Sequence, residues 1–591
     1  MPERHRRVLG LVLSAGLMAG PLTLPALAQP APEPTEVNVN SPEAKPAGPV
    51  AIVNGKQVPV PNIAMGDAAT VKRIIEEGRD RSQVMDHLTH LTQQIGPRLT
   101  GSTRAKQAND WARQRFESWG LSGARLEQWG TVGVGFDRGP STGKVLVRVE
   151  RGPQDDRRVE FDAVRQLTLT TLSWTPGTEG PVRGPVVKMP KTEEEYAAVK
   201  ESLKGAWLLL EPPPPVGQRG VRSRAAVNYQ QRTEARQKVA AGEDPSTLPI
   251  PQRVIFDGIA GFIATSRDER VWTGAVGGWR DLTMDTLHKD VQATVTLSDY
   301  DFINSRLADR EPIQLELDLK HTFNPGPVPV FNTIAEIRGS EKPDEYVVIG
   351  AHMDSWDGPG SQGATDNGTG TSVMLEAARI LAAALKDAPP EARPKRTIQV
   401  VLYTGEEQGL LGSSAHLEMN KDKWPAISAA FVDDGGTNSQ GGTPAPTDIV
   451  PFLAAASAPV NYQFFSKTDN RWLNVNIRDI GNRLVQGGGS DHAAYNRRGI
   501  PGFYWDEVGR ADYQFGWHTQ HDTIALAIPE YLMQSAVNTA VVAYNLACAD
   551  GLLPRPPAPQ PTEGQNENQN SNQPAQPRGQ TAPAGQGAGS N

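Results

Sequence analysis

The sequence lacks the features that mark three classes of protein. Its 591 residues contain a single cysteine, Cys548, so no disulfide can form within the chain. After residue 28, no apolar run is long enough to span a bilayer. The formal net charge of −8 at pH 7 gives no reason to expect a nucleic-acid partner. These absences exclude a disulfide-rich protein and argue against a membrane span after residue 28 and against a nucleic-acid partner. The function has to be sought in the motifs.

The first 28 residues have the pattern of a secretory signal peptide. Arginines precede an apolar stretch over residues 8–24, and Ala26-Leu27-Ala28 is a small-residue cleavage site. An uncleaved membrane anchor is the rival interpretation, but glycine and proline interrupt the apolar stretch. We therefore expect an exported protein, periplasmic or extracellular, whose mature chain begins at Gln29 and has no membrane contact after cleavage.

Composition divides the remaining chain into folded and unfolded parts. Residues 29–66 are rich in proline, alanine and asparagine, and residues 554–591 in proline, glutamine, asparagine and glycine, so we expect a disordered leader and a disordered tail. The length between them exceeds what one hydrophobic core usually supports. We expect a main domain in two parts, residues 67–139 and 322–553, interrupted by an insert over residues 140–321.

The main domain shows the pattern of an α/β fold. Apolar residues recur at the helical period over residues 84–95, and a second helix is expected over residues 105–119. After residue 322, strands and helices alternate, and the runs 347–349 and 400–402 are apolar throughout, as expected for strands covered on both faces. This predicts a mixed, largely parallel sheet flanked by helices.

The insert has a different sequence pattern. Short β-like runs, at residues 144–149, 206–210, 259–264 and 291–297, are separated by turns. A basic segment over residues 219–236 has the composition of a solvated loop. We therefore expect a separate β-rich module.

Acidic and imidazole side chains come directly after several predicted strands. His352, the pair Glu406-Glu407 and the pair Asp433-Asp434 each follow an apolar run. Functional groups in open α/β sheets gather at the carboxyl ends of strands, so these side chains should meet at one edge. A pair of zinc ions roughly 3.5 to 4 Å apart needs a shared carboxylate, one further carboxylate and one imidazole for each ion, and a free carboxylate as base.

The sequence contains a side chain for each of these positions. We assign Asp366, in a glycine-rich turn, as the carboxylate that bridges two zinc ions together with a water molecule. His352 and Asp434 complete one site, and Glu407 and His518 complete the other. Two positions stay open, because Asp433 could replace Asp434 and His521 could replace His518. The glycines at 435 and 436 favour Asp434, and the spacing to Asp522-Thr523 favours His518.

Two more acidic residues have predicted roles beside the metal ligands. Glu406 is predicted to be the general base. The side chains of adjacent residues at a strand end point in different directions, so Glu407 can bind metal while Glu406 reaches the bridging water. Asp354 lies two residues beyond His352 on the same side of an extended chain, so it can orient that imidazole.

Several segments, in their order along the chain, resemble the M28-type zinc peptidase family, which contains aminopeptidases and the plasma glutamate carboxypeptidase-like dipeptidases. The similarity covers most of residues 70–132 and 322–550. The matching segments are Gly96-Pro97-Arg98-Leu99-Thr100-Gly101-Ser102, His352-Met353-Asp354-Ser355-Trp356-Asp357, Asp366-Asn367-Gly368, Thr404-Gly405-Glu406-Glu407-Gln408-Gly409, Asp434-Gly435-Gly436 and His518-Thr519-Gln520-His521-Asp522-Thr523.

The resemblance implies further features of fold and site. It implies a zinc-exopeptidase fold in which the insert is a protease-associated domain, and a cis peptide bond between Asp366 and Asn367. It places the phenol of Tyr513 near the reacting carbonyl, where it could stabilise an oxyanion. It also places Asp491 and His492 in a loop near the substrate.

These observations together predict an exported metallo-exopeptidase with a peptide substrate. We expect it to remove amino-terminal residues from short peptides or to cleave dipeptides. The alternatives are a carboxypeptidase, a glutaminyl cyclase with one zinc ion, and a non-catalytic receptor of the same fold. The sequence leaves a homodimer open.

Overall fold

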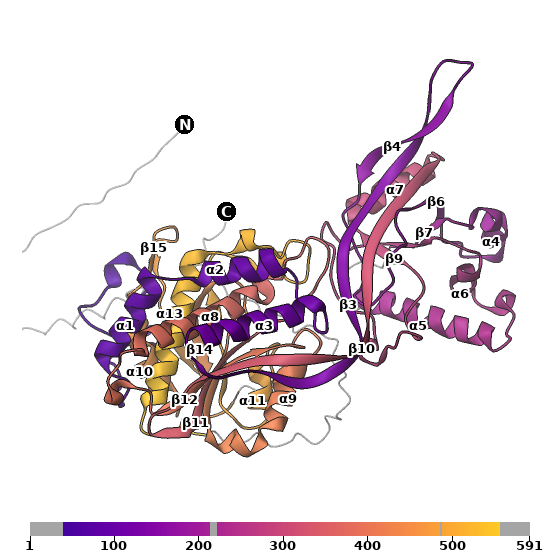
Figure 1. Ribbon diagram of the computed structural model, residues 1–591. Coiled ribbons are helices and arrows are strands. Elements are labelled where there is room, and N and C mark those ends of the chain that lie inside the picture. The colour runs from indigo at the N-terminus through magenta and orange to yellow at the C-terminus, as the bar shows by residue number, and fades with distance from the viewer. Residues whose placement is uncertain (1–38, 213–220, 485–486, 556–591) are drawn as a thin grey trace, which may run out of the picture. The chain divides into compact units, whose positions relative to one another are not determined.

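The computed structural model describes residues 39–212, 221–484 and 487–555 (Figure 1). The predicted signal peptide, residues 1–28, and nearly all of the predicted tail, residues 554–591, lie outside these ranges. Among the described residues, no helix has the length and hydropathy needed to cross a membrane.

Parallel strands form the part of the main sheet that matters for function. β11 (Lys342–His352) pairs in parallel with β12 (Arg396–Tyr403) on one side and with β13 (Ile427–Val432) on the other, and β18 (Gly502–Tyr504) follows β13. β10 (Ile313–Ile337) pairs antiparallel with β12. The predicted mixed, largely parallel sheet is therefore confirmed.

Helices cover both faces of this sheet, as the unbroken apolar runs predicted. Val347 of β11 belongs to the core formed with α8 (Thr369–Leu385) and α13 (Pro529–Cys548). Its neighbour Val348 points to the opposite face, into the core formed with α9 (Leu411–Met419). Figure 1 shows α8 and α13 on one side of the sheet and α9 on the other. Strands buried on both faces hold their carboxyl ends in fixed positions, where a site can be built.

The first part of the main domain adds three helices to the face of α8 and α13. These are α1 (Ala68–Asp80), α2 (Val84–Thr89) and α3 (Thr103–Ser118). α1 packs against both α8 and α13, and α2 packs against α8. The helix predicted over residues 84–95 is α2, which continues into a π-helical turn, His90–Ile95.

Two long strands join the main domain to the insert. β3 (Ser122–Arg151) and β10 pair antiparallel from Ser122 opposite Glu336 to Val147 opposite Ile313 (Figure 1). Both predicted boundaries of the insert, at residues 140 and 321, fall inside these strands. The short strand expected over residues 144–149 is therefore part of one long strand, and no flexible linker separates the two regions there.

The insert itself contains a parallel run of strands and several helices. The run is β6 (Val182–Lys188), β7 (Trp207–Leu209), β8 (Gly261–Thr265) and β9 (Gln292–Val295). The remaining elements of the insert are β4 (Arg158–Gln166), β5 (Leu169–Thr170), α4 (Glu193–Val199), α5 (Val221–Ala240), α6 (Ile250–Arg253) and α7 (Leu297–Ala308). Its identity as a protease-associated domain stays a prediction.

The prediction of a solvated loop over residues 219–236 is wrong where the structure describes it. Residues 221–236 lie in α5, and Tyr229 and Arg232 are buried. The guanidinium of Arg232 lies 4.7 Å from the ring centre of Tyr229 and 4.2 Å from that of Phe262. Arginine can be buried against aromatic rings because its charge is attracted to their faces, so a basic composition did not mean solvent exposure.

The expected disordered leader is also wrong in part. Residues 51–58 form a hairpin of β1 (Ala51–Val53) and β2 (Lys56–Val58), in which Ala51 and Ile52 are fully buried. β1 pairs with β17 (Asn476–Asp479) in a second sheet with β14 (Ser439–Ala445) and β19 (Asp506–Val508). Three-residue strands carry almost no periodic signal, and the partner strand β17 is far away in the sequence. Composition alone therefore suggested disorder where the chain forms strands.

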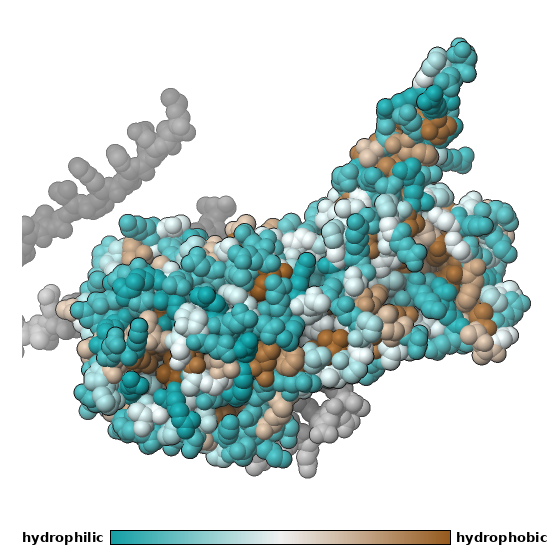
Figure 2. Space-filling view, in the orientation of Figure 1, coloured by the Kyte–Doolittle hydropathy of each residue, from teal (hydrophilic) through white to brown (hydrophobic). Residues whose placement is uncertain are grey.

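The described surface gives no direct indication of a partner. On the face drawn in Figure 2, hydrophilic residues dominate and apolar residues occur in small groups. A homodimer stays open, as the sequence left it.

The short helices α10 (Val450–Ser457), α11 (His492–Asn496) and α12 (Tyr513–Gly516) and the hairpin of β15 (Phe465–Ser466) and β16 (Arg471–Trp472) complete the fold.

Candidate metal centre

The predicted ligands lie at the carboxyl edge of the parallel strands. His352 is the last residue of β11, while Glu407 and Asp434 follow β12 and β13 within four residues. Asp366 lies in the turn Ala364–Gly368, just before α8. His518 follows α12 in the loop toward α13.

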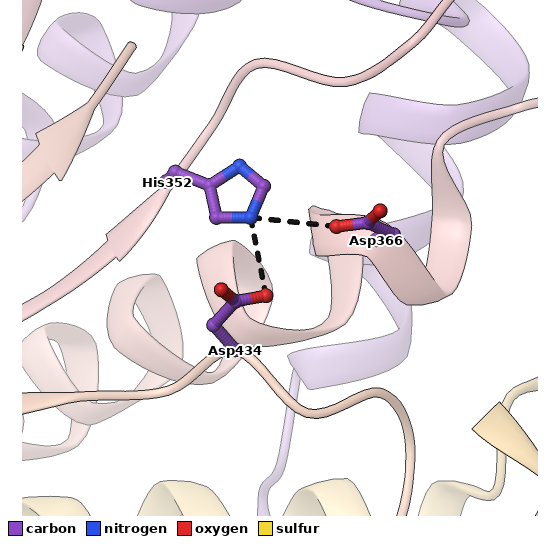
Figure 3. A group of neighbouring side chains, drawn as sticks. All are labelled: His352, Asp366 and Asp434. Carbon is purple, nitrogen blue, oxygen red and sulfur yellow. Dashed lines mark hydrogen bonds and ion pairs between the residues drawn. The ribbon is translucent and has the colours of Figure 1, made fainter. Parts of the chain in front are cut away.

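His352, Asp366 and Asp434 form a first group (Figure 3). The Nε2 atom of His352 lies 3.1 Å from Oδ1 of Asp434 and 3.4 Å from Oδ1 of Asp366. One ligand atom from each side chain lies within 4.8 Å of the others. A single cation could contact all three.

Asp366, Glu407 and His518 form a second group of the same size. The Nε2 atom of His518 lies 3.0 Å from Oδ2 of Asp366 and 2.9 Å from Oε2 of Glu407. Asp366 thus offers one carboxylate oxygen to each group, which is the geometry of a bridging carboxylate. The peptide bond from Asp366 to Asn367 is cis, as the family resemblance implied.

Glu406 belongs to neither group, although it lies beside them. Its Oε2 atom is 3.9 Å from Nε2 of His352. A carboxylate that is close to both groups but outside them is free to exchange a proton, as the prediction for this residue requires.

Asp354 lies on the far side of the His352 ring. The Nδ1 atom of His352 is 3.0 Å from the main-chain oxygen of Asp354 and 3.5 Å from its Oδ1. The carboxylate also accepts a hydrogen bond of 2.9 Å from Thr100 and longer ones from the main-chain N–H groups of Glu406 and Glu407. Asp354 therefore fixes the imidazole and the Glu406-Glu407 turn together.

The protein compensates the charge of this cluster only in part. Burial acts to raise the pKa of Asp366, but hydrogen bonds from His352 and His518 outweigh it and lower that pKa. Burial raises the pKa of Glu406 and of Glu407 well above the ordinary value, and the charges of neighbouring carboxylates add to this effect against the opposing charge of His352. Burial lowers the pKa of His352, but the charges of Asp434 and Glu406 outweigh it and raise the pKa well above 6.5. Carboxylates that crowd together in a dry site need a cation between them.

The donor atoms fit divalent zinc. The Nδ1 atom of His352 faces oxygen acceptors of Asp354, so in the neutral ring this atom would carry the proton. The lone pair of Nε2 would then point at the carboxylates of Asp434 and Asp366. Only a proton or a cation makes that arrangement favourable. Imidazole nitrogen and carboxylate oxygen are ligands that zinc accepts. The two groups together could hold two such ions.

The structure separates the alternatives that the sequence left open. Asp433 lies outside both groups and accepts a hydrogen bond of 2.6 Å from Gln440. The ring of His521 stacks on Phe515 at 4.6 Å between centres. Asp434 and His518, and not these neighbours, meet the other candidate ligands.

Tyr513 lies close to the cluster. Its ring packs over Gly436, where an added Cβ would come within 2.7 Å. Burial, followed by the charges of Asp366 and Asp434, raises the pKa of its phenol well above 10, so the hydroxyl keeps its proton at neutral pH. Its role as oxyanion donor stays a prediction.

The predicted substrate contacts are less accessible. Asp491 has no exposed surface, and its charge contributes to the raised pKa of Glu406 after burial and the nearer charges. His492 is 7% exposed, and burial lowers the pKa of its ring to about 4. Asp491 therefore lies beneath the site, and its predicted direct contact with substrate has no support in this geometry.

Three residues that the sequence reasoning gave no role support the ligands. The Tyr504 hydroxyl donates to the main-chain oxygen of Asp434. Asp522 accepts from the main-chain N–H and the hydroxyl of Thr365, at 2.6 and 2.7 Å, and so fixes the turn of Asp366. Arg98 is fully buried and donates to main-chain oxygens around the site. Asp522 and Arg98 both stand in segments that carry the family resemblance, so a signal was present.

Known proteins match both the sequence and the fold. The model of peptidase family M28 matches residues 332–543. Carboxypeptidase Q of Xenopus laevis is 30% identical over 47% of this chain and 54% of its own, and Carboxypeptidase Q of Mus musculus is 27% identical over 81% of this chain and 88% of its own. The match to the frog relative thus spans about half of that protein.

A solved structure extends the agreement to the fold. The crystal structure of a peptidase M28 precursor from Shewanella amazonensis superposes with a TM-score of 0.52, at 24% identity, over 83% of this chain and 98% of that one. The segment matched by the family model contains both candidate cation groups and Glu406. The part of the chain that holds the candidate metal centre is therefore similar to peptidase family M28.

Proposed function

We propose that this protein is an exported exopeptidase with two zinc ions, which removes amino-terminal residues from short peptides or cleaves dipeptides. The observation that carries the proposal is the pair of carboxylate–imidazole groups that share Asp366. A single-zinc cyclase would not need the second group, and a non-catalytic receptor would need neither the ligands nor a free base.

The proposed chemistry assigns a proton transfer to Glu406. Zinc, when bound, supplies Lewis acidity toward the scissile carbonyl and toward the attacking water. Glu406 takes a proton from that water and returns it to the leaving amine as the peptide bond breaks. Tyr513, which keeps its phenolic proton, can donate a hydrogen bond to the oxygen on which negative charge develops.

The charge around the site supports recognition of a free amino terminus. Glu507 lies close to the loop that carries Asp434. A Cβ atom added at Gly435 would come within 2.1 Å of the Cγ atom of Glu507. Burial, and then the charges of Asp433 and Asp434, raises the pKa of Glu507 well above the ordinary value, so an ammonium group beside it would favour its ionised form. Arg98, whose guanidinium could otherwise attract a substrate carboxylate, donates to the main-chain oxygens of Met353, Gln362 and Gly363 and has no exposed surface.

A carboxypeptidase is the second candidate, because the relatives described above are named Carboxypeptidase Q. Hydrolysis of one tripeptide in three forms separates the two: free at both ends, acetylated at the amino terminus, and amidated at the carboxyl terminus. We expect acetylation to abolish turnover and amidation to leave it largely unchanged. The reverse result would identify a carboxypeptidase.

Two controls test the remaining parts of the proposal. Loss of hydrolysis on chelation, and its return with zinc, would exclude a receptor without activity. Export is tested by the amino terminus of the protein isolated from the extracytoplasmic fraction, which we expect to be Gln29.

A further inference from the structure

A short segment of the insert lies directly against the loop that carries His518. We call this segment, residues 269–273, the strap. The N–H of Thr273 donates to the main-chain oxygen of His518 at 2.9 Å, and its hydroxyl lies 3.2 Å from the same oxygen. Trp272 forms an antiparallel β-bridge with Thr519. A ligand of the main domain is thus held through its main chain by the insert.

The side chain of Gln520 locks the same two segments from the other direction. Its Oε1 accepts a hydrogen bond of 2.8 Å from the N–H of Val271, and its Nε2 donates to the oxygen of Glu269 at 3.0 Å. Arg270 adds a hydrogen bond of 3.0 Å to the main-chain oxygen of Gln514. The main chain on both sides of His518 is therefore tied to the strap.

The strap also contacts the loop that follows His352. A Cβ added at Gly358 would come within 1.9 Å of Cγ2 of Thr273, so the two segments are in close contact. One residue earlier, Asp357 accepts a hydrogen bond of 2.6 Å from Ser173 of the insert, whose N–H in turn donates to Gly274 at 2.8 Å. The strap is held between two ligand loops and cannot move independently of them.

His518 needs such support because of its backbone conformation. Its φ angle is +56°, in the left-handed region that residues with a side chain seldom adopt. A residue in that region keeps its conformation only when its surroundings fix it. The strap fixes the carbonyl of this residue, and so it fixes the direction in which the imidazole leaves the chain toward Asp366 and Glu407.

We infer that the strap is a positioning element of the second cation group, and that the insert is in this way a working part of the active site. Thr273 and Gln520 are the positioning residues, acting through the main chain around His518. The inference rests on the proposed function, because it requires that Asp366, Glu407 and His518 hold an ion.

The test measures zinc content and zinc affinity in the full-length mature protein after dialysis. Thr273→Pro removes the N–H that donates to His518, whereas Thr273→Val keeps that N–H and serves as the matched control. We expect the proline variant to retain one zinc ion and to bind the other 10- to 100-fold more weakly, the range for lost supporting contacts around a metal site. It should then resemble His518→Ala rather than His352→Ala in zinc content.

Gln520→Ala gives a second route that leaves the main chain unchanged, should proline disturb folding. We expect a loss of affinity for one ion of about tenfold, with the thermal midpoint of the zinc-free protein unchanged, and we expect hydrolysis to recover at high zinc. Wild-type affinity for both ions in the Gln520→Ala and Thr273→Pro proteins would overturn the inference, as would equal weakening of both ions. Failure of the proposed function is seen separately, as fewer than two zinc ions in the wild-type protein.

Discussion

Two buried clusters of acidic and imidazole side chains lie along helix α8, and they differ in how their charge is neutralised. At the start of the helix, the carboxylates around Asp366 face one another and two imidazoles. Further along, Glu376 accepts two hydrogen bonds from Arg379, at 2.8 and 2.9 Å, and lies 3.2 Å from His87. Arg379 also donates to Glu77 at 2.6 Å.

The difference in pairing appears in the pKa shifts. Burial raises the pKa of Glu376, but hydrogen bonds from Arg379 and His87 outweigh it, and the net pKa is lower than ordinary. Burial and like charges together raise the pKa of Glu406. The cluster around Glu376 is complete within the protein and contributes to stability, whereas the cluster around Asp366 requires an added cation and is suited to function. Burial of charge alone does not distinguish them; the presence of a partner does.

The largest expected effect is on catalysis, from Glu406→Gln. Turnover should fall about 10²- to 10⁴-fold because the base is lost, while both zinc ions are retained. Stability of the zinc-free protein should stay the same or rise, since a crowded carboxylate is removed. Steady-state kinetics, zinc analysis and denaturant unfolding measure the three quantities.

Glu418→Gln is the matched control, because Glu418 is exposed on α9. Full turnover by a zinc-loaded Glu406→Gln protein would rule out this base, and a marked loss of stability would break the contrast between the clusters.

Next in size is the effect of Arg379→Met on stability. Removing the arginine takes two hydrogen bonds from the buried Glu376 and one from Glu77, which keeps only its pair with Arg81. This should lower the free energy of unfolding by about 3 to 5 kcal/mol. Zinc content and kcat of the folded protein should not change. Denaturant unfolding checks the first expectation and activity at low temperature the second.

Arg79→Met provides the comparison, since the ion pair of Arg79 with Asp80 is exposed and should contribute little to stability. If Arg379→Met reduced activity without reducing stability, the assignment of the second cluster as structural would be wrong.

Asp354→Asn should have a smaller effect, on the affinity for zinc. It removes the charge behind His352 while preserving shape, so zinc affinity should fall about 10- to 100-fold with activity recovering at high zinc. Competition with a chelator of known affinity measures the change. Asp344→Asn, at an exposed position of β11, should leave affinity unaltered. Equal affinities in the two variants would remove Asp354 from the site.

The smallest effect concerns pH and lies at the end of the insert, in β10. Burial, and then the charge of Arg138, lowers the pKa of His321 to about 4. The unfolded chain therefore binds a proton below pH 6.5 that the folded one binds only near pH 4, and stability should fall as the pH falls through that window. The slope from this group is at most about 1.4 kcal/mol per pH unit.

His321→Gln should remove that part of the slope, as measured by denaturant unfolding at several pH values between 4 and 7. An unchanged slope in the variant would show that other groups account for the acid sensitivity. The slope above pH 7 serves as the internal control, because both states hold His321 neutral there.

Much of the main domain was predictable because its strands are unbroken apolar runs. The strand that ends at His352 and the helix expected over residues 105–119 appear in the structure almost as expected. The same local signal placed acidic residues after strands, and the parallel order of β12, β11 and β13 brought them together. Strand-end residues are set by local pattern and sheet direction, which sequence carries.

What could not be predicted depends on contacts between distant residues. Glycine and proline around residues 139 and 325 suggested breaks in the chain, so β3 and β10 could not be predicted as two long strands. In the structure both strands continue past these residues through β-bulges. The hydrogen bond from Thr273 to His518 joins residues 245 positions apart. The sequence around neither residue indicates that the two segments meet. Arg379 and Glu77 meet across 302 positions for the same reason.

The pairing of β3 with β10 also constrains how the chain can fold. Ser122 hydrogen-bonds to Glu336, 214 residues further along, so the sheet cannot close until the whole insert has been synthesised. Until then β3 presents an unpaired edge, which is prone to aggregation. If the chain is exported as proposed, a long wait before closure would help to keep it unfolded for translocation. Excising the insert would leave two cut strands and no complete enzyme.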